Sequence, residues 1–147
     1  MSTSENYQII QIIIIFTVAF LGAITNQIKI KFGLFAKYKS EKKIFKRWSN
    51  EDDDMVTADR IVANLVEWGI IFWPLFFGCI LVHGSTGNHI IAGYVYVIAR
   101  LIYVLLGCAV TFKNHITNLK VLVATIPAYG ALIYLIVILL PEMIKQD

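Results

Sequence analysis

Four long apolar stretches divide this sequence, and they constrain its fold more than any other feature. They cover residues 9–28, 61–82, 90–112 and 121–140 of the 147. An α-helix rises about 1.5 Å per residue, so roughly 20 apolar residues cross the hydrocarbon core of a bilayer. The sequence therefore predicts an all-α fold: an integral membrane four-helix bundle, with residues 1–147 forming a single transmembrane domain.

Basic residues are concentrated after the first stretch. Eight of the 13 Lys and Arg residues lie between residues 29 and 47, and Lys113 and Lys120 flank the third connection. Because cytoplasmic loops carry an excess of Lys and Arg, we expect the third connection and a loop over residues 29–59 to face the cytoplasm. The acidic residues at 51–54 disfavour a nucleic-acid partner. Anionic lipid headgroups are the expected contact of the basic residues.

The first apolar stretch is predicted to be a retained helix and not a cleaved signal. Residues 1–8 contain Glu5 but no Lys or Arg, whereas a cleaved signal has a basic leader. Cys79 and Cys108 lie inside apolar stretches, where a thiol packs as a small apolar group, so no disulfide is expected. The three histidines lack the spacing of metal ligands, and no metal site is expected.

Local signals predict where the helices end or bend. Thr57 or Asp59 is suited to cap a second helix that begins near residue 59. The Gly- and Ser-rich residues 84–88 predict a tight turn, which makes the second and third helices antiparallel neighbours. Pro74 and Pro127 each remove a backbone hydrogen bond inside a stretch, so both are predicted to bend their helices.

Ionisable groups inside the stretches require a partner, because an unpaired charge in a membrane costs several kcal/mol. Arg60, Asn64 and Glu67 are spaced by four and three residues, which predicts one stripe facing the bundle. Arg100 lies in the middle of the third stretch, and Glu67 is the one acidic residue within any stretch. We therefore predict a Glu67–Arg100 pair. Two interpretations of the stripe stay open: a structural lock, or a site for a ligand that carries both charge signs.

Three segments of this sequence resemble the membrane-associated proteins in eicosanoid and glutathione metabolism, the MAPEG family. They are ITNQIKIK at residues 24–31, DRIVANLVE at residues 59–67 and ARLIY at residues 99–103. The second carries the most specific match: an Arg, three residues, an Asn, two residues and a Glu. By these motifs the chain resembles, within that family, the microsomal glutathione transferases and microsomal prostaglandin E synthase.

The resemblance implies a homotrimer that binds glutathione between neighbouring protomers, near the cytoplasmic ends of the helices. It also implies which residues contact the tripeptide or organise its pocket: Lys29, Arg60, Asn64, Glu67 and Arg100. Lys29 stands where the synthase pattern has an Arg, so it keeps the charge but loses the planar two-donor fork. Endoplasmic reticulum is the membrane that the family implies, with mitochondrial and bacterial membranes left open.

The chain departs from the family at the residues that activate the glutathione thiol. Members commonly use an Arg near the start of the fourth helix, but no Arg follows Arg100 here. A reactive thiolate needs a nearby cation or hydroxyl donor. Tyr103 and either Thr117 or Lys120 are therefore the catalytic candidates.

Two functions follow from the resemblance. The first is a glutathione-dependent membrane transferase or peroxidase that acts on lipophilic electrophiles or lipid hydroperoxides entering from the bilayer. The alternative is a non-catalytic member that binds a lipid or a partner protein, or a structural subunit of a membrane complex. The missing Arg favours the alternative, while the intact stripe on the second helix favours the enzyme.

Overall fold

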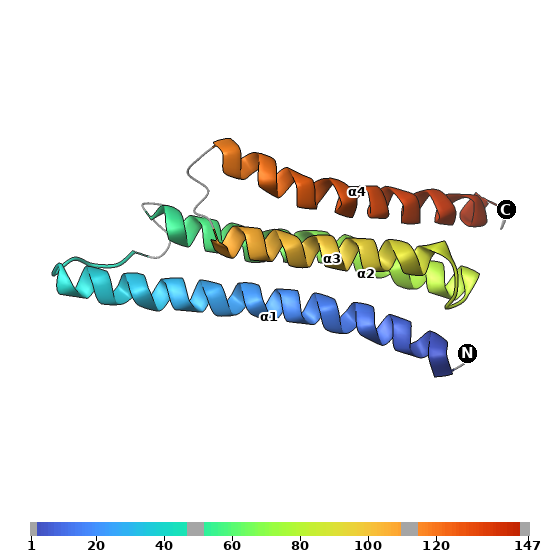
Figure 1. Ribbon diagram of the computed structural model, residues 1–147, viewed down its shortest axis with the longest axis horizontal. Coiled ribbons are helices and arrows are strands. Elements are labelled where there is room, and N and C mark those ends of the chain that lie inside the picture. Colours follow the sequence, from blue (N-terminus) through green and yellow to red (C-terminus); the bar gives the residue numbers. More distant parts are fainter. Residues whose placement is uncertain (1–2, 47–51, 110–114, 145–147) are drawn as a thin grey trace.

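The computed structural model of the chain describes residues 3–46, 52–109 and 115–144. Four helices run along its long axis: α1 (Thr3–Ser40), α2 (Asp53–His83), α3 (Asn88–Ala109) and α4 (His115–Ile144) (Figure 1). Each contains a segment that is long and apolar enough to cross a membrane. The predicted all-α membrane fold of four helices is therefore confirmed.

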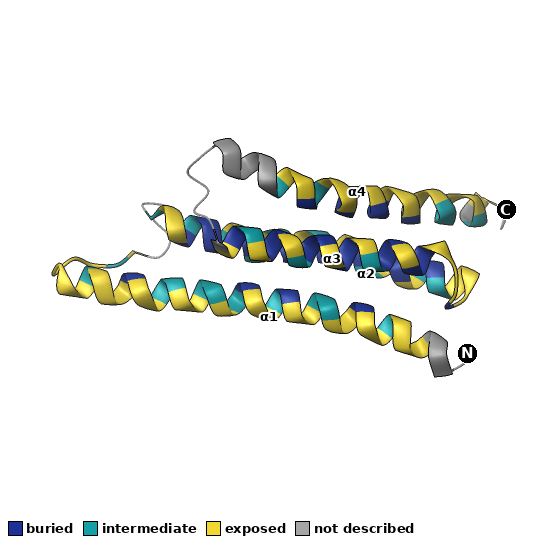
Figure 2. Ribbon diagram, in the orientation of Figure 1, coloured by how far each residue is buried: buried dark blue, intermediate teal, exposed yellow. Residues whose placement is uncertain are grey.

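The helices form an open arrangement in which α2 and α3 lie between α1 and α4 (Figure 1). Within the described residues, α1 and α4 do not contact each other. Helix α3 packs against all three other helices, and 56% of its apolar segment is buried, compared with 28% in α2. The outer surfaces of α1 and α4 are largely exposed (Figure 2). These apolar surfaces are suited to contact lipid or another protein.

The central core is built from large side chains of α1, α2 and α3 that lie close together. Ile12, Phe72, Phe76 and Tyr96 are fully buried, and the Phe72 and Tyr96 rings stack with centroids 3.9 Å apart. Gly93 of α3 makes this packing possible. A Cβ at this position would lie 2.6 Å from Cε2 of Phe76 and 2.9 Å from Cδ1 of Ile12.

We expect Gly93→Ala to destabilise the protein by about 1–3 kcal/mol, because the added methyl group overpacks the core. Gly130→Ala is the matched control, since a Cβ at Gly130 meets nothing within 4 Å. That substitution should stabilise α4 by up to about 1 kcal/mol through helix propensity. Thermal unfolding of the purified variants in detergent measures both effects, and equal shifts in the two variants would contradict the packing described for Gly93.

The connection between α1 and α2 is shorter than the predicted loop over residues 29–59. Helix α1 continues through residues 29–40, and α2 begins at Asp53. The N-cap is Asp52, whose carboxylate accepts a hydrogen bond from the Asp54 backbone N–H at 3.2 Å, so Thr57 and Asp59 do not cap the helix. The apolar stretch stops at residue 28, but the following lysines are good helix formers. Loss of apolar character therefore did not mark the end of the helix.

Helix α1 ends in a Schellman motif. Lys42 has a left-handed φ of 55°. The Lys43 N–H donates to the Tyr38 carbonyl at 2.9 Å, and the Lys42 N–H donates to the Lys39 carbonyl at 3.2 Å. Glycine usually occupies the left-handed position of this motif, because a Cβ there is crowded. The chain places a lysine at a site that favours glycine.

Lys42→Gly should raise the stability of the protein by about 0.5–1 kcal/mol, because it relieves the left-handed strain. Ala36→Gly in the exposed interior of α1 is the control and should lower stability by a similar amount. Thermal unfolding midpoints in detergent test this prediction. A lower midpoint for Lys42→Gly would show that the left-handed conformation of Lys42 is not strained.

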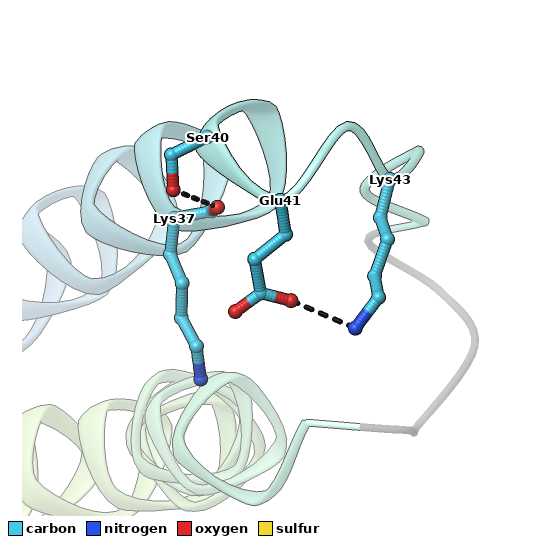
Figure 3. Close-up of polar contacts among 4 residues, drawn as sticks. All are labelled: Lys37, Ser40, Glu41 and Lys43. Atoms are coloured by element: carbon cyan, nitrogen blue, oxygen red, sulfur yellow. Dashed lines mark hydrogen bonds and ion pairs between the residues drawn. The ribbon is translucent and has the colours of Figure 1, made fainter.

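Side chains reinforce this helix end (Figure 3). The Ser40 hydroxyl donates to the Lys37 carbonyl at 2.7 Å, and the Lys43 ammonium lies 2.8 Å from a Glu41 carboxylate oxygen. The hydrogen bond from Lys43 lowers the pKa of Glu41, with a smaller contribution from Lys37. The same bond raises the pKa of Lys43. Both groups are exposed, so this pair orients the chain after α1 without contributing much stability.

The predicted turn between α2 and α3 is confirmed. Gly84 ends α2 with a φ of 83°, and its N–H donates to the Ile80 carbonyl at 2.9 Å. Gly87 has a φ of 127°, which L side chains rarely adopt. The His89 Nε2 atom lies 2.8 Å from the Gly84 carbonyl oxygen and so links the turn to α3.

Candidate functional site

The polar stripe of α2 lies at the edge of the helix packing surface. Asn64 is half-buried, whereas Arg60 and Glu67 are exposed on this chain. The prediction that all three residues face the bundle is therefore wrong for Arg60 and Glu67. The buried face of α2 is centred on Ile61 and Leu65, which directly follow Arg60 and Asn64 in the sequence. The stripe is therefore rotated away from the centre of this face.

Arg100 is fully buried within the bundle and contacts Asn64. Its Nη1 atom donates to Oδ1 of Asn64 at 3.0 Å, which joins α3 to α2. Among the described residues, Nε and Nη2 of Arg100 have no hydrogen-bond partner. The predicted Glu67–Arg100 pair is therefore wrong. Asn64 occupies the side of α2 that approaches α3, while the Glu67 carboxylate lies on the outer surface.

Three aromatic rings surround the buried guanidinium. Its Cζ atom lies 5.1 Å from the Tyr96 ring centroid, 5.7 Å from that of Tyr129 and 5.9 Å from that of Trp68. Attraction between the cation and the ring faces offsets part of the cost of burying the charge. Arg100 therefore organises the interior behind Asn64 and does not present its charge on the surface of this chain.

Sequence reasoning missed this aromatic enclosure, although spacing signals for it exist. Trp68 lies four residues after Asn64 on α2, and Tyr96 lies four residues before Arg100 on α3. Residues four apart are neighbours on a helix surface, so each aromatic ring lies one turn from a partner of the Arg100–Asn64 bond. Tyr129 of α4 has no such signal, because its position depends on how α4 packs.

Two polar residues of α1, Gln27 and Lys29, lie at the same end of the bundle as Arg60. Nε2 of Gln27 donates to Oδ1 of Asp59 at 2.6 Å, which joins α1 to α2 one residue before Arg60. Lys29 follows two residues later on α1 and is exposed. Lys29 and Arg60 therefore lie at the same end of the bundle, near the end of the apolar part of α1.

Two grooves follow one another along α2. The first is mixed polar and apolar, has a volume of about 500 Å³ and begins at the N-terminal end of the helix. The second is almost entirely apolar, has a volume of about 400 Å³ and lies between α1 and α2. The first is lined by Asp53, Val56, Asp59, Arg60 and Ala63. The second is lined by Phe16, Phe20, Leu65, Val66, Gly69, Ile70, Trp73 and Pro74.

The structure describes the side chain of only one of the three catalytic candidates. Tyr103 is only 6% exposed and belongs to a core group with Ile61 and Leu65 of α2. Thr117 and Lys120 fall in the first two turns of α4, whose side chains lie outside the described residues. The structure thus joins Asn64 to Arg100 and leaves the catalytic assignments as predictions.

Four long apolar helices and a charged, fully buried arginine define this chain as a multi-pass integral membrane protein. A model of the MAPEG family matches residues 9–140, and the chain belongs to this family. Comparisons with curated proteins and with solved structures give no match. The family match covers α2 and α3 completely, most of α1 and α4, and every residue of the α2 stripe.

Proposed function

We propose that this protein is a glutathione-dependent membrane transferase or peroxidase that acts on lipophilic electrophiles or lipid hydroperoxides. The observation that carries the proposal is the exposed charge on α2: Arg60 and Glu67 lie on the outer surface of a helix that contains a segment long and apolar enough to cross a membrane. A charge at such a position needs a polar neighbour. Glutathione supplies two carboxylates and an ammonium group, which match the cation and the carboxylate of the stripe.

The Arg100–Asn64 bond gives Asn64 a defined role in this site. A guanidinium can only donate hydrogen bonds, so the Asn64 atom that faces it must be the amide oxygen. The amide NH₂ group is then free to donate to a peptide carbonyl or carboxylate. Arg100 acts in this proposal as a positioning residue that holds the amide in one orientation.

The homotrimer is part of the same proposal. Glu67 is exposed on the single chain, within the apolar segment of α2, where contact with lipid would be unfavourable. A neighbouring protomer against this surface would enclose a ligand between two chains and shield the carboxylate. Lys29 and Arg60 would then contribute their charges near the membrane boundary.

The order of the two grooves supports the proposed chemistry. The polar groove at Arg60 suits the water-soluble tripeptide, and the apolar groove further along α2 suits a lipophilic acceptor. In a transferase, the thiolate attacks an electrophilic carbon and the leaving group departs. In a peroxidase, two glutathione molecules become the disulfide while the hydroperoxide becomes an alcohol and water. Tyr103, Thr117 and Lys120 remain the candidates to stabilise the thiolate.

Turnover tests this proposal directly. The full-length protein in detergent should conjugate glutathione to a chromogenic lipophilic electrophile or reduce a lipid hydroperoxide. Binding of glutathione without either reaction would support the alternative, a non-catalytic MAPEG protein, which the missing Arg after Arg100 favours. If the protein showed no glutathione binding and no turnover, the enzyme would be excluded.

A further inference from the structure

The end of α1 projects beyond the packed part of the bundle (Figure 1). The Gln27–Asp59 hydrogen bond fixes the register of α1 against α2. Beyond this bond α1 continues to Ser40, whereas α2 extends back only to Asp53. At about 1.5 Å per residue, α1 extends roughly 20 Å past the bond and α2 only roughly 9 Å.

The projecting part of α1 carries one exposed stripe of two phenylalanines and a lysine. Phe32, Phe35 and Lys39 are spaced by three and four residues, so they share a helix face. Phe32 is 65% exposed and Phe35 is 55% exposed, and Lys39 is also exposed. Leu34, on the other side of the helix, is buried. We call Phe32, Phe35 and Lys39 the Phe–Lys stripe.

The end of α1 and the segment after it are strongly positive. Residues 29–46 contain seven lysines and a single acidic residue, Glu41, which pairs with Lys43. The chain turns back at Lys42, and the Phe45 ring packs edge-on against Tyr38 with centroids 5.5 Å apart. The segment after α1 therefore returns alongside the helix at Tyr38.

We propose that the Phe–Lys stripe binds anionic phospholipid headgroups. Phe32 lies only about 6 Å beyond the apolar stretch that ends at Ile28, at the depth of the headgroup layer. Aromatic rings are favourable at this depth, and a lysine stem lies along the apolar surface while its ammonium reaches a phosphate. The two rings favour a lipid phosphate over free inorganic phosphate, because inorganic phosphate has no apolar group that could contact them.

Stabilisation by added lipid tests the proposal. The full-length protein in a neutral detergent is titrated with a short-chain phosphatidylserine, and its thermal unfolding midpoint is followed. We expect a saturable rise in the midpoint that high salt abolishes. The matching phosphatidylcholine and inorganic phosphate should give no rise. A rise with either of them to the same extent would overturn an anionic-lipid site.

Two matched variants locate the site on α1. Lys39→Gln should raise the phosphatidylserine concentration for half of the midpoint shift by about fivefold, the loss expected for one lysine at an anionic surface. Lys37→Gln should change it less than about twofold, because Lys37 contributes to lowering the pKa of Glu41 and so lies near that carboxylate. Equal weakening by the two variants would show a diffuse charge effect and would overturn the stripe as the site.

Discussion

Asn64→Ala is expected to destabilise the protein by about 2–3 kcal/mol, although Asn64 is only half-buried. The substitution removes the hydrogen-bond acceptor from the Arg100 guanidinium, which is fully buried and has no other hydrogen-bond partner among the described residues. A buried charge that loses its polar contact bears the full cost of desolvation. Chemical or thermal unfolding in detergent measures the loss.

A double-substitution cycle separates this mechanism from a simple loss of packing. Arg100→Met replaces the charge with an apolar side chain of similar length among Trp68, Tyr96 and Tyr129, and should cost less than about 1 kcal/mol. In the Arg100→Met background, Asn64→Ala should then cost less than about 1 kcal/mol as well. Additive effects of the two substitutions would contradict an energetically important Arg100–Asn64 bond.

Arg60→Gln and Glu67→Gln are each expected to weaken glutathione binding by about 10–100-fold, because each removes one proposed charge partner of the tripeptide. Both side chains are exposed on the single chain, so the stability of the protomer should change by less than about 0.5 kcal/mol. Isothermal titration calorimetry and thermal unfolding of the same preparations provide the two readouts. Glu41→Gln, which changes an exposed carboxylate outside the stripe, is the control.

The fold could be predicted because a bilayer permits few backbone structures. In a bilayer, every backbone polar group must be satisfied within the segment, so each apolar stretch of spanning length becomes a helix. The tight turn could also be predicted, since Gly84 and Gly87 both adopt the positive φ angles that glycine allows. The end of α1 could not, because apolar character stops at residue 28 while helical hydrogen bonding continues to Ser40.

The candidate site was only partly predictable. The sequence predicted a buried polar partner for Arg100 on α2 but assigned Glu67 to this role, whereas the structure shows Asn64 in it. Spacing could not choose between Asn64 and Glu67 as the partner of Arg100. That choice depends on the rotation of α2, which the buried positions Ile61 and Leu65 determine through packing.

The most direct measurement compares glutathione with N-acetylglutathione, which lacks the ammonium charge, in calorimetric titrations of wild-type protein and Glu67→Gln. If Glu67 binds the ammonium group, acetylation should weaken binding to wild type by at least about tenfold and have little further effect on Glu67→Gln. No saturable binding of glutathione to wild type, or an equal effect of acetylation on both proteins, would contradict the proposed site on α2.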